Sequence, residues 1–171
     1  MSENKILTKK QGTIKTPRMV FIPGNVPSLK NSKIKTSRGI FSSKTVKKYI
    51  TALGIQQFSS SKQTVKGYVD PNRPNKIEEL RPYLEAMKKG IDEPIIMGLH
   101  HVRGSKRLFD FSNSVEIIQD LLTAHKIIED DNVRFLFTVP MTIDGKLVTE
   151  KNKDKLYSVD KFNPGVWVKF F

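Results

Sequence analysis

The chain has 171 residues, with 30 Lys and Arg against 17 Asp and Glu, so its formal net charge is +13. It contains no cysteine, which excludes disulfides, thiol nucleophiles and cysteine-ligated zinc or iron–sulfur sites and indicates a reducing, cytoplasmic setting. The length fits one domain, and the sequence shows neither a signal-peptide pattern nor an apolar run of ~18 residues, so we expect no membrane partner.

The positive charge is concentrated in the first third of the chain. Residues 1–50 hold twelve bases and one acid, Glu3, whereas the remainder is nearly balanced. Between residues 108 and 132 the sign reverses, because six acids face only Lys126. The basic excess favours a polyanionic partner, foremost nucleic acid; an anionic membrane surface and charge carried only for solubility are the alternatives.

The first half of the chain predicts a tail, a short strand, a loop and an amphipathic helix. Residues 1–17 are polar and basic and predict a flexible tail before a single domain over 18–171. Residues 19–22 predict a strand, and turn-forming residues over 25–35 predict an exposed loop. The apolar spacing after Ser42 or Ser43, as helix cap, predicts a helix to residue 58.

The second half alternates further helices and strands. Residues 59–75 form a polar connection. Helices are predicted over 76–89 and over 113–126, the latter opened by Asn113 and Glu116 as a capping box. The strands predicted from apolar runs cover 94–102, 133–139, 147–149 and 166–171. These elements predict one α+β domain, in which a mixed β-sheet carries helices mainly on one side.

Acidic residues gather around the second of these helices. Asp110 precedes it, Asp120 projects from it, and Glu129, Asp130 and Asp131 follow it. A strand–helix–loop unit could bring these carboxylates together, and a divalent cation would relieve their mutual repulsion. The equally simple alternative is that Asp110 caps the helix, Asp120 is solvated and the acidic run forms a turn.

An ordered series of short motifs covers most of residues 19–171. The series is Val26-Pro-Ser-Leu-Lys-Asn-Ser, the helix opening at Ser42/Ser43, Phe109-Asp110-x-x-Asn113, Asp120-x-Leu122, Ile128-Glu-Asp130-Asp131-Asn132-Val133 and Asn163-Pro-Gly-Val-Trp-Val. Each motif is short, but the ordered set is fairly specific. In this set the chain resembles the RusA-type Holliday-junction resolvases of phages and prophages.

The resemblance implies a RusA-like homodimer that resolves four-way DNA junctions, in DNA recombination and repair, by hydrolysing phosphodiester bonds in opposing strands. It implies Mg²⁺ as cofactor, with Mn²⁺ as a possible substitute. Asp110, Asp130 and Asp131 would then be catalytic metal ligands, with Asp131 the better match to the family's second acid, and Asp120 would be an accessory catalytic acid. Residues 59–92 would be a possible insertion relative to the family.

The chain departs from the family pattern at two positions. Ser112 stands where the family often has a second aspartate, and Glu116 stands where it has a catalytic lysine. Because Glu116 and Asp120 share a helix face with Asn113, either could supply the missing carboxylate.

Basic side chains flank the acidic residues and occupy the first loop. The candidate DNA-binding residues are Lys30, Lys33, Lys35, Arg38, Arg103, Lys106 and Arg107. The alternative function is a non-catalytic nucleic-acid-binding protein, on the same fold or on an unrelated basic fold. Phe135 and Phe137 are expected in the core, Trp167 in the core or a dimer interface, and the three histidines in structural or solvent-facing positions.

Overall fold

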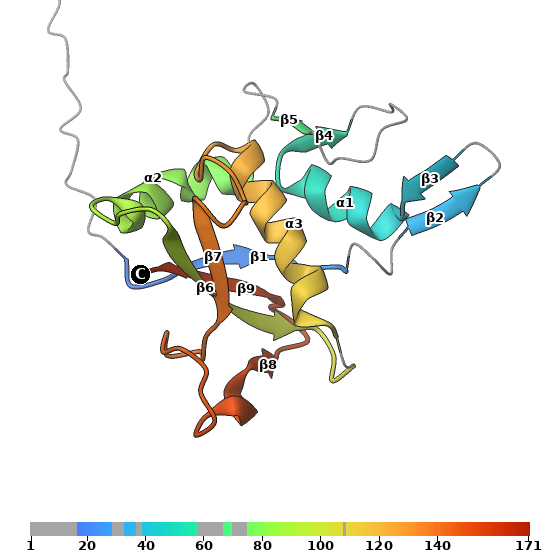
Figure 1. Cartoon of the computed structure of the whole chain (residues 1–171). Helices are drawn as coiled ribbons and strands as arrows, with labels where there is room; N and C mark the ends of the chain where they lie inside the picture. Colours follow the sequence, from blue (N-terminus) through green and yellow to red (C-terminus); the bar gives the residue numbers. More distant parts are fainter. Residues whose placement is uncertain (1–16, 29–32, 37–38, 58–66, 70–74, 108) are drawn as a thin grey trace, which may run out of the picture.

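The computed structural model describes residues 17–28, 33–36, 39–57, 67–69, 75–107 and 109–171. The strands are β1 (Val20–Pro23), β2 (Lys33–Thr36), β3 (Gly39–Ser42), β4 (Ile55–Gln57), β5 (Gly67–Val69), β6 (Ile95–Arg103), β7 (Leu136–Pro140), β8 (Tyr157–Val159) and β9 (Gly165–Phe170). The helices are α1 (Lys44–Ala52), α2 (Lys76–Lys88), α3 (Phe111–Ala124) and the short 3₁₀ helix η2 (Lys153–Lys155). Figure 1 shows α3 beside the sheet and the β2–β3 hairpin projecting from the far end of α1.

The principal sheet has five strands of mixed direction. The order is β1-β9-β6-β7, and β8 also pairs with β6. β6 is central: it runs antiparallel to β9, with Leu99 opposite Val168, and parallel to β7 and β8, with Ile95 opposite Leu136 and His101 opposite Tyr157. The predicted mixed-sheet α+β fold is therefore confirmed, as are its strands along β1, β6 and β9, to within one or two residues at each end.

The core lies on one face of this sheet. Along β9, Val166 and Val168 are buried with Ile22 of β1, and the apolar faces of the helices complete the same cluster. Intervening residues of β1 and β9 point to the other face, where Phe21 and Trp167 pack with ring centroids 4.9 Å apart. The alternation of two residues along a strand thus separates a helix-covered face from an aromatic one.

α1 is shorter than the sequence predicts. The Ser43 side chain caps it by accepting a hydrogen bond from the Val46 backbone N–H, as expected. The helix ends at Ala52 because Gly54 has a φ of +93°, which glycine adopts without a side-chain clash. Residues 55–57 form β4 instead, so the predicted continuation of the helix to 58 was wrong at its end.

α2 forms almost as predicted and becomes part of the core. Asn75 caps it through a 3.0 Å hydrogen bond from the Glu78 backbone N–H, and Ile77, Leu84 and Met87 are buried. α2 contacts β1 and β9, so it packs across the helix-covered face.

α3 begins earlier than predicted. Its N-cap is Asp110 and not Asn113, which lies inside the first turn and is buried. Asn113 instead donates its side-chain N–H to the Asp110 carboxylate at 2.9 Å. The predicted capping box is therefore wrong, and the alternative that Asp110 caps the helix is correct.

Three further expectations are corrected. Residues 33–35, predicted as loop, belong to β2, which pairs antiparallel with β3. Residues 133–135 are turn and not strand, because the Phe135 and Leu136 N–H groups both donate to the Asn132 carbonyl. Phe137, predicted in the core, is 53% exposed because β7 turns this side chain to the face of the sheet opposite the core.

No helix within the described ranges is long and apolar enough to cross a membrane. The predicted tail over 1–17 lies outside the described residues except at position 17.

Candidate functional site

Asp110 lies where the chain passes from β6 into α3. Its carboxylate accepts hydrogen bonds from the Ser112 backbone N–H at 3.0 Å, the Ser112 hydroxyl at 2.6 Å and the Asn113 amide at 2.9 Å. The first of these bonds satisfies a backbone N–H that the first helical turn leaves unpaired, and a negative charge here complements the helix dipole. Ser112 therefore serves the cap as a hydrogen-bond donor at the position where the resembling family often has an aspartate.

Asp120 lies on the third turn of α3 in a region of negative charge. Burial of this carboxyl, followed by the charges of Asp131 and Glu116, raises its pKa to about 6. Glu116 is four residues away on the same face, a spacing at which like charges repel. The structure thus brings together Asp120, Asp131 and Glu116.

Asp130 and Asp131 form the turn that follows α3. The Asp130 carboxylate accepts hydrogen bonds from the Asp131 backbone N–H and from the Asn132 amide, each at 2.7 Å. The pKa of Asp130 is lowered by its hydrogen bonds to Asp131. The pKa of Asp131 is raised by burial and by its hydrogen bond with Asp130. Asp130 therefore braces the turn that carries Asp131.

The two ends of α3 separate the predicted acids into two groups. Asp110 and Asp120 are ten residues apart along the helix, which corresponds to roughly 15 Å. Two ligands of one Mg²⁺ ion lie within about 4 Å of each other, because each bond is close to 2.1 Å. Asp110 and Asp120 of one chain therefore cannot hold the same ion, and within the described ranges no three His, Asp or Glu side chains form a metal-binding group.

Arg103 ends β6, seven residues before Asp110, and its partly buried guanidinium packs against the protein. It donates to the Val26 carbonyl at 2.7 Å and lies 4.7 Å from the centre of the Phe109 ring. The Asn25 side chain also accepts from the Gly104 backbone N–H at 3.4 Å. Arg103 thereby fixes the 25–28 segment against the carboxyl end of β6.

The other basic candidates belong to two separate segments of the chain. Lys106 and Arg107 are exposed in the loop between β6 and α3, a few residues before Asp110. The backbone of Lys33 and Lys35 belongs to β2, at the projecting hairpin in Figure 1. Lys30 and Arg38 lie outside the described residues.

All three histidines are buried, in agreement with a structural role. The ring nitrogens of His100 lie 3.0 Å from the Met141 carbonyl and from the Ser158 hydroxyl. His101 packs against Phe109 and Phe111, and burial lowers its pKa to about 3. His125 caps the end of α3 and bridges two other helices through Glu78 and the Leu53 carbonyl.

Sequence reasoning did not single out Phe162, the most exposed large apolar side chain of the described residues, at 91%. A lone phenylalanine between Lys161 and Asn163 gives no periodic signal from which its exposure could be predicted.

Comparisons with protein-family models, with curated proteins and with solved structures give no match.

Proposed function

We propose that the protein is a Mg²⁺-dependent endonuclease that cuts branched DNA and acts as a homodimer in the cytoplasm. The observation that carries the proposal is the placement of the partly buried Asp120 beside Asp131 and Glu116, which also raises the pKa of Asp120. Carboxylates held together in this way favour a proton or a divalent cation. The ordered motifs that resemble RusA-type resolvases indicate the substrate.

The donor set fits Mg²⁺, which is commonly bound by one or two carboxylates and completed by water. Asp120 and Asp131 would hold the ion, and Asp130 positions Asp131 through the turn. When bound, the cation supplies an activated water and stabilises negative charge on the reacting phosphate. Lys106 and Arg107, exposed before α3, hold the DNA backbone.

Asp110 has a separate role in this proposal. It holds the N-terminus of α3 and, through the helix, the position of Asp120. In a homodimer, two symmetry-related sites would face the two opposing strands of a junction.

A second candidate is a non-catalytic binder of branched nucleic acid. The Ser112 hydroxyl, which donates to Asp110 and supplies no carboxylate, is the observation that favours it. Under this proposal the basic residues bind the phosphate backbone, and the acids only shape the turn after α3.

Cleavage of a labelled four-way junction, beside linear duplex and fork controls, distinguishes the two candidates. With Mg²⁺ or Mn²⁺, the wild-type chain is expected to cut the junction, and Asp120→Asn and Asp131→Asn to lose at least a hundredfold in rate. Glu129→Gln, an exposed acid on the same connection, is the matched control and should cut normally.

Three results would contradict the proposal in whole or in part. Junction binding without cleavage, across both metals and over pH 6–9, supports the non-catalytic binder. Normal cleavage by Asp131→Asn would show that Asp131 does not bind the catalytic metal ion. Equal cutting of all three DNAs would leave a nuclease without selectivity for junctions.

A further inference from the structure

Phe162 is presented to solvent by a loop that the sheet holds firmly. The loop of residues 160–164 connects β8 to β9, both of which pair with β6 near its carboxyl end. With 91% of the side chain exposed, Phe162 makes little use of its ring inside the protein. The side chain therefore has a surface role or none.

Hydrogen bonds fix both ends of this loop. The Asp160 backbone N–H donates to the Arg103 carbonyl at 2.9 Å, and the Gly24 N–H donates to the Pro164 carbonyl at 2.8 Å. Within the loop, the Asp160 carboxylate accepts from the N–H groups of Phe162 at 2.9 Å and of Asn163 at 3.1 Å. The ring consequently projects from a backbone that is already ordered, so little backbone entropy is lost on binding.

Cationic side chains lie in this loop and in the neighbouring loop after β6. Lys161 lies with its ammonium 5.9 Å from the centre of the Phe162 ring. The chain beyond Gly104, which lies beside Pro164, carries the exposed Lys106 and Arg107. The carboxylate of the nearby Asp160 accepts hydrogen bonds from two backbone N–H groups.

The β8–β9 loop and the start of α3 also occupy the same end of the molecule, as Figure 1 shows for β8 and the N-terminal turn of α3. An open aromatic ring among cations is the combination that binds nucleic acid with unpaired bases: the cations hold phosphates and the ring stacks on a base. A fully paired linear duplex offers no such base away from its ends.

We propose that Phe162 is a DNA-binding residue that stacks on an unpaired or unstacked base at the branch point of the DNA. The inference rests on the proposed binding of branched DNA and adds to it the residue that distinguishes a branch from a duplex. Lys161, Lys106 and Arg107 bind the phosphates on either side of that base.

The test measures binding in EDTA, so that no cleavage intervenes. The probes are a four-way junction with 2-aminopurine beside the branch point and a linear duplex of the same sequence. Phe162→Ala and Phe162→Leu are expected to weaken junction binding by about 5- to 150-fold, because stacking of one base on an aromatic ring is lost. Phe162→Trp should keep the affinity, and duplex binding should change less than twofold in all three.

Phe137→Ala is the matched control, because Phe137 is also exposed but pairs with Ile96 near the opposite end of β6. It should bind the junction as the wild type does. The wild type and Phe162→Trp should change the 2-aminopurine fluorescence on binding, and Phe162→Ala should not.

The outcomes separate this inference from the proposed nuclease. Wild-type affinity and fluorescence in Phe162→Ala overturn the stacking role, even if the protein cleaves junctions. Loss of binding in Phe162→Ala but not in Phe162→Leu also overturns it, since an aliphatic contact would suffice. Binding that depends on the ring supports stacking whether or not the DNA is cut, and absence of any DNA binding by the wild type overturns both proposals.

Discussion

The carboxyl group of Asp120 is partly buried on α3 beside two other acids, Asp131 and Glu116. In the unfolded chain an aspartate ionises near 3.8, whereas in the folded protein the pKa of Asp120 is about 6. Below pH 3.8 the group is neutral in both states. As the pH rises from there through 6, the unfolded state releases its proton first, so the stability of the fold falls.

Replacing Asp120 by Asn should therefore stabilise the protein at high pH. We expect the free energy of unfolding at pH 8 to rise by about 1 kcal/mol, and Tm by about 2–4 °C, after allowance for partial exposure of the group. The gain should shrink to nothing as the pH is lowered towards 3.8. Thermal unfolding of Asp120→Asn, with Glu129→Gln as control, measures this difference; an equal gain at pH 4 and pH 8 would contradict it.

The buried ring of His125 joins three helices. Its ring nitrogens lie 2.8 Å from Glu78 Oε1 and 2.9 Å from the Leu53 carbonyl oxygen. The ring therefore links α3 to Glu78 of α2 and to the end of α1. Arg81 completes the group with two hydrogen bonds to Glu78 and one to the His125 carbonyl.

Removing the charge of Glu78 should destabilise this junction of helices. The hydrogen bonds from Arg81, followed by the contact with His125, lower the pKa of Glu78 to about 2, so its contribution is present above about pH 4.5 and lost as the pH falls towards 2. We expect Glu78→Gln to cost about 1–2 kcal/mol at pH 7 and progressively less below pH 4.5. Urea unfolding measures both.

Glu79→Gln is the matched control for Glu78→Gln. Glu79 pairs with Lys76 at 2.6 Å on the exposed side of the same helix. Exposed pairs of this kind contribute less than about 1 kcal/mol. A loss of stability in Glu79→Gln as large as in Glu78→Gln would show that the buried histidine adds nothing.

At the scale of elements, the cap of α3 separates two possible roles of Asp110. Asn caps a helix about as well as Asp, whereas Ala cannot accept the Ser112 N–H. Asp110→Ala should therefore cost about 1 kcal/mol and Asp110→Asn much less, by urea unfolding. If Asp110→Asn folds with wild-type stability yet fails to cut a junction, the carboxylate takes part in the reaction; unchanged cutting would limit Asp110 to the cap.

Local pattern predicted that α3 exists but not where it begins. Asp110 and Asn113 are both good caps three residues apart, and propensity cannot decide between them. Burial of Asn113 and its hydrogen bond to Asp110 decide it, and both depend on tertiary packing. The same limit applies to α1, where an apolar pattern continues beyond the glycine that ends the helix.

The acids were predicted as one group, yet α3 divides them. Because Asp110 and Asp131 flank one helix in the sequence, they were predicted to lie close together. The parallel pairing of β6 with β7, however, requires α3 to return the chain to the amino end of β6. Asp110 therefore lies at the start of α3, and Asp131 lies beyond its other end. The neighbourhood of Asp120 and Glu116, in contrast, follows from helical periodicity and was predictable.

At the scale of the whole molecule, the net charge of +13 predicts binding to DNA that weakens steeply with salt. Each phosphate contact adds about 0.9 to the slope of log K against log salt. A Lys106→Ala, Arg107→Ala double variant should therefore lower the magnitude of the slope by about 2. Fluorescence anisotropy over 50–300 mM salt measures the slope.

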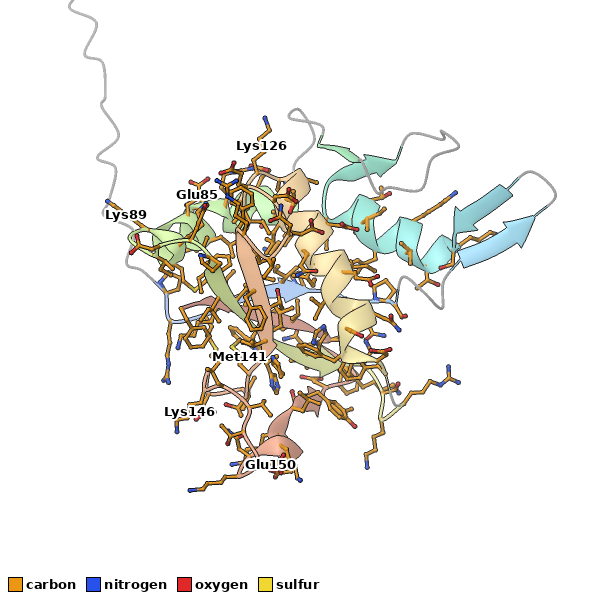
Figure 2. All side chains as sticks on the ribbon, in the orientation of Figure 1. Glu85, Lys89, Lys126, Met141, Lys146 and Glu150 are labelled. Atoms are coloured by element: carbon orange, nitrogen blue, oxygen red, sulfur yellow. The ribbon has the colours of Figure 1, made fainter. Side chains whose placement is uncertain are left out.

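Lys89 provides the control. It is exposed just after α2, and Figure 2 shows it on the side of the molecule away from β8, which is labelled in Figure 1. Lys89→Ala should leave the slope unchanged within about 0.5 if DNA binds at the carboxyl end of β6. A reduction of about 1 in Lys89→Ala, half that of the double variant, would mean that charge acts without a defined surface.

Gly165, at the start of β9, is a point of close approach between β9 and β1. A Cβ atom there would lie 2.3 Å from Phe21 Cζ and 2.6 Å from the Ile22 carbonyl oxygen. Gly165→Ala should therefore cost about 1–3 kcal/mol by forcing the two strands apart. Gly104→Ala, whose Cβ would meet nothing closer than 3.8 Å, is the control and should be nearly neutral in the same thermal unfolding experiment.

The close approach of β9 to β1 at Gly165 predicts which positions of the chain tolerate substitution under different selections. In a saturation-mutagenesis library selected only for folded protein, position 165 should accept little besides glycine, while Asp120 and Asp131 tolerate many replacements. A library selected for cleavage of junctions should reverse the tolerance at the two acids and leave position 165 as it was. Tolerance at Gly165 therefore reports whether a variant folds, and under the proposed function tolerance at the two acids reports whether it cuts DNA.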